Sequence, residues 1–391
     1  MSFLVNTTKL CDLYLTERDV IERFIGSALF TWGTGGSGAL GDNSSINKSS
    51  PVQTVSTGLN WIRACSNGLT GSQGGIKLDG TLWLWGDNSA GNLGNNNTVN
   101  RSSPVQTVAA GTNWCNLSFS NTGRSAGLKT DGTLWLWGCG TAGTLGDNNT
   151  IRRSSPVQTV ATGTNWTSVA SGSQHMAGIK RDGTLWMWGL NTTGELGINN
   201  IVSRSSPVQT ISTTTTWCSV AVSGCATAGL KTDGTLWLWG GNGGTLGNND
   251  TVGRSSPVQT VSTGTNWKQV SVGCTGLGGH VQAIKIDGTL WLWGRNEGGA
   301  LGNNNTINRS SPVQTVATGT NWRVLASIQA GNRSGAIKTD GTLWLWGCNQ
   351  NGNLGINSLI TQSSPVQTIA LGTNWKQVSA GDTTVAVLNK F

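Results

Sequence analysis

Leucine and tryptophan alternate in the stretch Thr-Leu-Trp-Leu-Trp-Gly at residues 133–138. A period of two places the Leu side chains on one face and the Trp side chains on the other, which predicts a β-strand. The longer stretch Lys-Thr-Asp-Gly-Thr-Leu-Trp-Leu-Trp-Gly occurs three times, at 129–138, 231–240 and 338–347. Its Asp-Gly pair predicts a two-residue type I′ turn, so the stretch is expected to form a hairpin.

Three landmarks recur seven times along the 391 residues, and the first of them has a period of 51 to 54. An aromatic-x-Trp-Gly element comes first, then Ser-Ser-Pro-Val-Gln-Thr, then a Trp ten residues after the proline. Together these landmarks account for all seven prolines and all 20 tryptophans. A repeat of this length is typical of propeller blades and related arrays.

Each unit is expected to hold four short strands, a to d. Strand a begins at the isolated Trp, strand b ends at the Lys before the turn, strand c carries Trp-x-Trp, and strand d begins at the proline. A proline at that place suits an outer strand, which needs no donor there. Four antiparallel strands in each of seven units predict an all-β, seven-bladed β-propeller over residues 27–391.

The two ends of the repeat region complement each other. The C-terminal residues 375–391 supply strands a and b and stop before an Asp-Gly turn, whereas residues 27–33 begin at strand c. One blade is therefore expected to take strands from both ends of the chain. Such a shared blade closes the ring and removes its open edge.

The spacing Trp-Gly-x-Asn-x-x-Gly-x-Leu-Gly, followed by Pro, Val and Trp, stands in full at residues 186–217. This pattern resembles the regulator-of-chromosome-condensation repeat, a family of seven-bladed propellers. The family includes nucleotide-exchange factors, enzyme inhibitors, adhesive modules, and bacterial and viral proteins. The chain is similar to it over residues 27–391, although no inserted hairpin of the kind that an exchange factor uses is evident. We therefore expect a member of the bacterial or viral type.

Variation in length concentrates between strands a and b, where Trp to Asp-Gly spans 16 to 20 residues. Antiparallel order places the a–b and c–d loops on one face of the ring, and loops on a rigid frame commonly bind partners. The candidate partner-binding residues of these loops are Arg124, His175, Met176, His280, Asn332, Arg333 and Asp382.

The tryptophans of strand c recur at identical places, which indicates packing between blades rather than a specific site. The predicted structural residues are Trp83, Trp85, Trp135, Trp137, Trp186, Trp188, Trp237, Trp239, Trp291, Trp293, Trp344 and Trp346. The lysine before each Asp-Gly is expected to lie near these rings.

The net charge of +8 is spread over the units by the repeat, which makes nucleic acid an unlikely partner. No catalytic set, cofactor motif or metal-ligand cluster stands out, so we expect no enzyme, no cofactor and no metal. The eight cysteines show no regular pairing, and without an apolar signal segment reduced thiols are expected. No apolar stretch is long enough to span a membrane.

Residues 1–26 do not follow the repeat. Thr16 and Asp19 resemble a capping box that starts a short helix. The extension is predicted to be a docking arm, through the apolar residues Leu13, Leu15, Val20, Ile21, Phe24 and Ile25.

The leading hypothesis is a non-enzymatic virion component of a bacterial virus, in a tail, a baseplate or a head decoration. It would be made in the cytoplasm, join a virion or cell-surface assembly, and bind other subunits or a host glycan or receptor. A first alternative is a regulatory propeller that binds a GTPase or another enzyme. A second alternative is a carbohydrate-binding adhesin that uses the long c–d loops.

Overall fold

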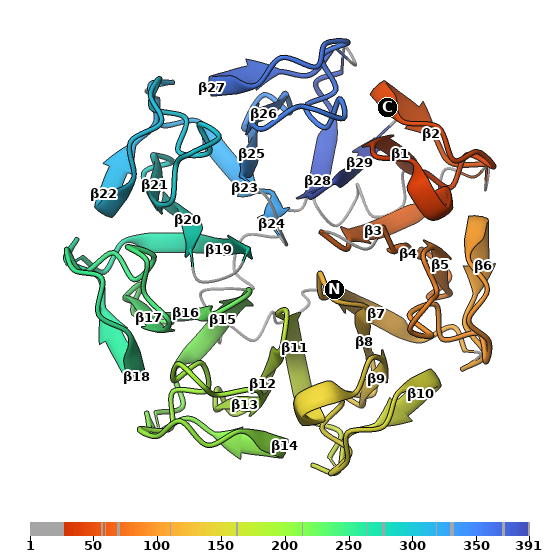
Figure 1. Ribbon diagram of the computed structural model, residues 1–391, viewed down its shortest axis with the longest axis horizontal. Coiled ribbons are helices and arrows are strands. Elements are labelled where there is room, and N and C mark those ends of the chain that lie inside the picture. Colours follow the sequence, from red (N-terminus) through yellow and green to blue (C-terminus); the bar gives the residue numbers. More distant parts are fainter. Residues whose placement is uncertain are drawn as a thin grey trace, which may run out of the picture.

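The computed structural model describes residues 27–389 except 56–57, 59, 69–70, 110, 162, 213, 263, 276–277, 318, 329–331 and 370–371. Seven antiparallel sheets radiate from a central axis, as Figure 1 shows. The predicted seven-bladed β-propeller is therefore confirmed. The extension at 1–26, with its predicted helix and its six apolar candidates, lies outside the described residues.

The blades are numbered from the one that contains strand β1. The innermost strand, a, of blades 1 to 7 is β28 (Trp375–Ala380), β3 (Trp61–Ser66), β7 (Trp114–Phe119), β11 (Trp166–Ser171), β15 (Trp217–Val222), β19 (Trp267–Thr275) and β23 (Trp322–Leu325). Strand b is β29 (Thr383–Asn389), β4 (Gln73–Lys77), β8 (Arg124–Lys129), β12 (His175–Lys180), β16 (Ala226–Lys231), β20 (Gly278–Lys285) and β25 (Arg333–Lys338).

The two outer strands follow in the same blade order. Strand c is β1 (Ser27–Gly33), β5 (Leu82–Gly86), β9 (Leu134–Gly138), β13 (Leu185–Gly189), β17 (Leu236–Gly240), β21 (Leu290–Gly294) and β26 (Leu343–Gly347). Strand d is β2 (Lys48–Gln53), β6 (Arg101–Gln106), β10 (Arg153–Gln158), β14 (Arg204–Gln209), β18 (Arg254–Gln259), β22 (Arg309–Gln314) and β27 (Gln362–Gln367). Strand d begins three residues before its proline, which corrects the predicted start.

Blade 1 closes the ring as the sequence predicts. Strand β1 pairs with β29 over seven residues, from Ser27↔Asn389 to Gly33↔Thr383. The order β2-β1-β29-β28 thus joins two strands from each end of the described chain.

The b–c turn differs from the prediction. Gly132 N donates to Lys129 O at 2.9 Å, and Lys129 N donates to Thr133 O at 3.1 Å. Only Gly132 has a positive φ, at 79°, and Asp131 does not. This is a three-residue loop with glycine in the left-handed position, not a type I′ turn. Asp131 keeps ordinary geometry because its carboxylate accepts bonds from the Thr133 amide and hydroxyl, at 2.9 and 2.7 Å.

The hydrophobic core is divided among the junctions between neighbouring blades. One cluster joins Leu134 and Leu136 of blade 3 to Trp166 and Trp188 of blade 4. Each fully buried Trp of strand c also donates its indole N–H across the junction, as Trp188 does to Thr144 O. This bond recurs at all seven junctions, at 2.7 to 3.0 Å. The second Trp of strand c therefore packs against the neighbouring blade and bonds to it.

The first Trp of each Trp-x-Trp pair is half-buried and serves the blade itself. The Trp135 indole donates to Thr133 Oγ1 at 2.9 Å. Lys129 Nζ lies 4.8 Å from the ring centre of Trp114 and 5.1 Å from that of Trp135. Equivalent lysines cover two rings in blades 2 to 7, which confirms the expected cation–π contact.

Two features break the repeat at the inner ends of the blades. Strands β19 and β20 form the longest a–b hairpin, paired out to Thr275↔Gly278. In blade 7 a short strand, β24 (Ser327–Ile328), leaves its own sheet and pairs in parallel with β28 of blade 1. The varied part of the sequence is therefore also where the ring departs from its symmetry.

Candidate functional site

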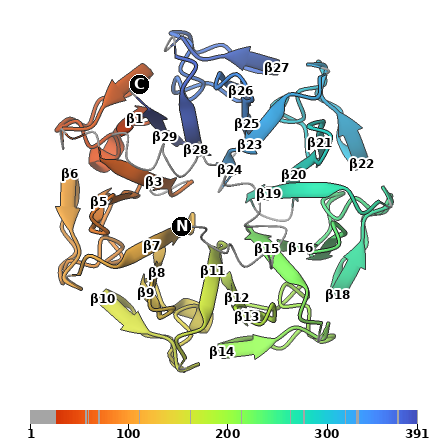
Figure 2. The same cartoon turned by 180° about the vertical axis from the view of Figure 1, so that it is seen from behind.

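The a–b and c–d loops lie on one face of the ring, which we name the loop face. The b–c turns and d–a links lie on the other face, the turn face, seen from opposite sides in Figures 1 and 2. The turn face carries the same Asp-Gly-Thr turn in blades 2 to 7. Only the loop face therefore differs strongly from blade to blade.

One position near the loop face is both varied and buried. It is the strand-b residue that pairs with the glycine that ends strand c, and we name it the junction position. Its occupants in blades 1 and 3 to 7 are Thr383, Arg124, His175, Ala226, His280 and Arg333. Five of these six side chains carry polar groups.

The two histidines at the junction position join neighbouring blades. His175 Nε2 lies 2.9 Å from Thr227 Oγ1 of blade 5, and that hydroxyl donates its proton to Glu195 O at 2.9 Å. The hydroxyl is therefore an acceptor toward the ring, so Nε2 of His175 carries hydrogen. His280 repeats the arrangement with Ser334 and Ala300 O. Burial lowers the pKa of His175 to about 3 and that of His280 to about 4.

The two arginines at the junction position have different partners. Arg333 Nη1 lies 2.7 Å from Asp382 Oδ1, across the junction with blade 1. Arg124 is 2% exposed and takes part in none of the ion pairs of the described residues. It donates to the hydroxyls of Thr144, Thr122 and Thr141, and to Ser173 O of blade 4. Cys139 Sγ lies 3.8 Å from Arg124 Nη2.

The structure corrects the predicted location of five candidates. Each of them lies in a strand rather than in a loop: Arg124, His175 and Arg333 begin their strands, Met176 is the second residue of β12, and His280 is the third residue of β20. Their exposed fractions range from 0 to 6%. They vary because each junction is filled differently, not because they face solvent. Their role in binding a partner stays a prediction, as does that of the partly exposed Asn332 and Asp382.

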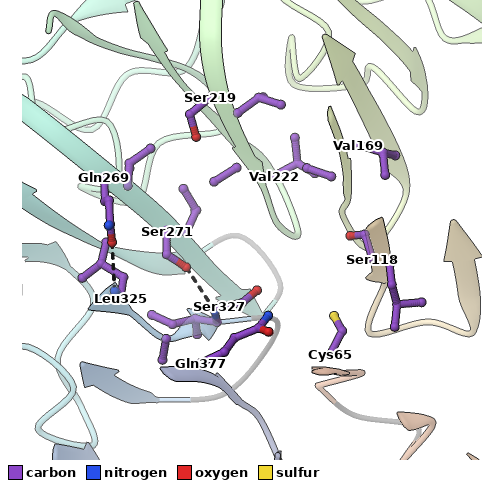
Figure 3. A pocket seen from close by; sticks show the side chains of 18 of the residues that line it. Cys65, Ser118, Val169, Ser219, Val222, Gln269, Ser271, Leu325, Ser327 and Gln377 are labelled. Carbon is purple, nitrogen blue, oxygen red and sulfur yellow. Dashed lines mark hydrogen bonds between the residues drawn. The ribbon is translucent and has the colours of Figure 1, made fainter. Parts of the chain in front are cut away.

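A central pocket of about 270 Å³ lies between the seven innermost strands. Figure 3 shows its wall, where the side chain of Gln269 reaches Leu325 of the next blade. Gln269 accepts from Leu325 N at 3.0 Å and donates to Arg323 O at 3.0 Å. Gln377 also reaches the next blade, where it accepts from Ala64 N at 3.2 Å and donates to Ala64 O at 2.9 Å. These links were not predicted from the sequence, although the recurring Trp-Lys-Gln-Val was a signal for them.

The cysteines depart from the expected reduced state at one place. Cys218 is disulfide-bonded, whereas the free thiols include Cys65, Cys115, Cys139 and Cys348. Within the described part of the chain, no cluster of three metal-ligating side chains is present. No helix found there is long and apolar enough to cross a membrane.

A family model for the regulator of chromosome condensation (RCC1) repeat matches residues 79–115, 131–179, 182–228, 287–336 and 340–388. A second RCC1 repeat model matches residues 166–195. The matched segments cover more than half of the chain.

Similar proteins are found over most of the chain's length. The mitochondrial RCC1 domain-containing protein RUG3 of Arabidopsis thaliana is 28% identical, over 92% of this chain and 86% of its own. The ultraviolet-B receptor UVR8 of the same plant is 26% identical, over 87% of this chain and 77% of its own. These relatives are eukaryotic, so they do not support the predicted bacterial or viral type.

Solved structures share the same fold. Human WBSCR16 superposes with a TM-score of 0.80 at 20% identity, over 93% of this chain and 99% of its own. Yeast RCC1 (Prp20), solved with Kap60, superposes with a TM-score of 0.81 at 17% identity, over 100% of this chain and 95% of its own. With the matched repeats and the seven blades, these findings place the chain in the RCC1 repeat family.

Proposed function

We propose that this protein is a non-enzymatic regulatory propeller that binds a protein partner through its loop face. The observation that carries the proposal is the contrast between the two faces. The turn face repeats one hydrogen-bonded turn, whereas the loop face presents a different a–b loop from every blade. A binding surface needs such local differences, and a frame does not.

The relatives support a regulatory partner more than a virion. One yeast structure is described with the binding of Prp20p to Gsp1p and histones, and UVR8 is named as a receptor. For this chain a small GTPase or another regulatory protein is accordingly the first partner to test. Neither a virion assembly nor a glycan has comparable support from these relatives.

Exposed charges on the two faces provide the test. Arg152 and Glu297 lie in c–d loops on the loop face, and Arg181 lies in a b–c turn on the turn face. A partner identified by affinity purification is titrated against Arg152→Glu, Glu297→Lys and the matched control Arg181→Glu. We expect weaker binding for the loop-face variants and wild-type binding for Arg181→Glu.

Two results would contradict the proposal. Loss of binding in Arg181→Glu alone would place the partner on the turn face. Equal binding by all three variants and by a chain with a shortened β19–β20 hairpin would remove the loop face from recognition. Stimulated release of nucleotide from a purified small GTPase, sensitive to the same loop-face variants, would identify the regulatory class.

A further inference from the structure

Blades 3 and 7 carry the same pair of residues at their junction positions and after strand c. Arg124 is followed in blade 3 by Cys139, and Arg333 is followed in blade 7 by Cys348. Each cysteine directly follows the glycine that ends strand c, and each is partly exposed and free. The chain therefore contains two copies of one arginine–cysteine arrangement.

The two copies differ in the anion that the arginine meets. The residue before strand b of the next blade is Asp382 beside blade 7 and Gln174 beside blade 3. The guanidinium of Arg333 bonds the Asp382 carboxylate through Nη1 at 2.7 Å and the Cys348 carbonyl, not its sulfur, through Nε at 2.8 Å. Gln174 brings no charge to Arg124. A buried cation without a carboxylate is costly, which favours an anion beside it.

The thiol of Cys139 is the group beside Arg124 that can supply an anion. Nη2 of Arg124 points to that sulfur at 3.8 Å, and Thr141 Oγ1 lies 3.4 Å from it. Thr141 in turn accepts from Arg124 Nη2 at 2.7 Å. The thiol is partly exposed, so a small reagent can reach it.

The charged groups around the thiol act in one direction. Burial alone would raise the pKa of Cys139, but the Thr141 bonds and the charges of Arg124 and Arg152 bring it below its usual value. Arg152 approaches from the c–d loop, and His175 of blade 4, next to Arg124, has its pKa lowered to about 3 by burial and by that arginine. His175 is therefore neutral at pH 7 and adds no charge beside the thiol.

We propose that Cys139 is a reactive thiolate held by Arg124, and that it is a site of modification by peroxides and small electrophiles. Reactive cysteines occupy electropositive, partly exposed places of this kind. With hydrogen peroxide, the sulfur attacks one oxygen, an S–O bond forms and the O–O bond breaks. The departing hydroxide takes a proton and leaves as water, so the thiol is oxidised to a sulfenic acid and the peroxide is reduced.

The first experiment compares the two cysteines within the same native chain. Iodoacetamide labelling of Cys139 and Cys348 is followed by mass spectrometry of their peptides between pH 5 and pH 9. We expect Cys139 to react several-fold faster at pH 7 and its rate to level off at a lower pH. The pH at which the rate levels off separates ionisation from accessibility. Equal profiles for the two cysteines would overturn the proposal.

The second experiment changes the charge beside each arginine and leaves the arginine and the cysteine themselves in place. Gln174→Asp should give Arg124 a carboxylate and slow the labelling of Cys139 at pH 7. Asp382→Asn should remove that carboxylate in blade 7 and speed the labelling of Cys348. Gln174→Asn is the neutral control. An unchanged Cys139 rate in a folded Gln174→Asp protein would contradict the role of Arg124.

Peroxide oxidation is read separately, by trapping the sulfenic acid with dimedone. Cys139 should be labelled before Cys348 in the wild-type chain, and Gln174→Asp should remove that preference. The assignment of Cys139 would be overturned if dimedone labelled Cys348 first, or if it labelled neither cysteine.

Discussion

Each blade junction has one part that is alike in all seven blades and one part that differs from blade to blade. Around the strand-c tryptophans every junction is alike, with a buried ring that donates across to the neighbouring blade at 2.7 to 3.0 Å. At the junction position, toward the loop face, histidine, arginine, alanine and threonine are used in different blades. Variation between copies therefore marks buried links as well as exposed loops.

The repeated half explains why the unit is so strongly restricted in sequence. Gly197 has φ of 63°, and a Cβ there would lie 2.8 Å from the indole nitrogen of Trp239 in the next blade. The indole of Trp239 also donates to the carbonyl of Glu195, two residues before that glycine, at 2.8 Å. Glycine, tryptophan and the loop backbone thus fit each other as one set, and a change in one requires changes in the others.

The largest expected effect distinguishes the two tryptophans of one strand. Trp188→Ala removes a fully buried ring and should lower the free energy of unfolding by about 3–5 kcal/mol. Trp186→Ala, the control in the same strand, removes a half-buried ring and should cost less. Urea denaturation measures both. Equal losses would mean that the strand-c Trp pair does not divide into a junction residue and a blade residue.

The second effect is a pH dependence that only the varied half should show. The pKa values of His175 and His280 in the folded chain, about 3 and about 4, lie below the ordinary 6.5. The unfolded chain therefore binds more protons below pH 6.5, and stability falls as the pH falls from 6.5 toward 4. Between pH 7 and pH 5 each histidine should account for about 2 kcal/mol.

The double variant His175→Gln and His280→Gln provides the control for that pH dependence. Its free energy of unfolding should change much less between pH 7 and pH 5. The turn aspartates do not contribute to this pH dependence. Their pKa values are lowered in the folded chain, so the stability that they add is lost only below about pH 3.8. A wild-type stability that is flat over this interval would show that the buried histidines are accessible to protons.

A smaller effect is expected from the repeated turn. Asp131→Ala removes the acceptor of the Thr133 amide and hydroxyl at an exposed position, and should cost about 1 kcal/mol. Asp131→Asn, which keeps an acceptor oxygen, should cost less. If alanine and asparagine are equally tolerated, the aspartate bonds are not what sets this three-residue loop.

The smallest expected effect concerns the lysine above the two rings. Lys129→Met keeps the apolar stem and removes the charge 4.8 Å from Trp114, for a loss of about 0.5–1 kcal/mol. Thermal unfolding compares it with Lys129→Arg, which keeps the charge. A methionine variant as stable as wild type would mean that the charge of the repeated lysine does not stabilise the blade.

The sequence predicted the ring because its signals are local and repeated seven times. Period-two alternation, proline in the outer strand and the shared blade each follow from residues close together in the chain. The turn type was wrong, because Asp-Gly alone does not reveal that Thr133 holds the Asp131 carboxylate. The five buried candidates were misplaced for a similar reason. Their partners lie in the next blade, about 50 residues away, as Thr227 does from His175.

The candidate site was predictable only in part. Length variation between strands a and b correctly located the face where blades differ, including the long β19–β20 hairpin. It did not distinguish a side chain that faces solvent from one that fills a junction. Cys139 shows the same limit. It occupies the same position of the repeat as Cys348, and their surroundings differ through Gln174 and Asp382 of the neighbouring blades.

The most direct test of this account is a double-mutant cycle between His175 and Thr227, the pair 2.9 Å apart across blades 4 and 5. The variants are His175→Ala, Thr227→Val and their combination, measured by urea denaturation at pH 7. If the varied residues are blade links, the pair should show a coupling free energy of at least about 1 kcal/mol. If the losses in the free energy of unfolding are simply additive, the account is contradicted. The variation at His175 would then have to be explained by binding to a partner.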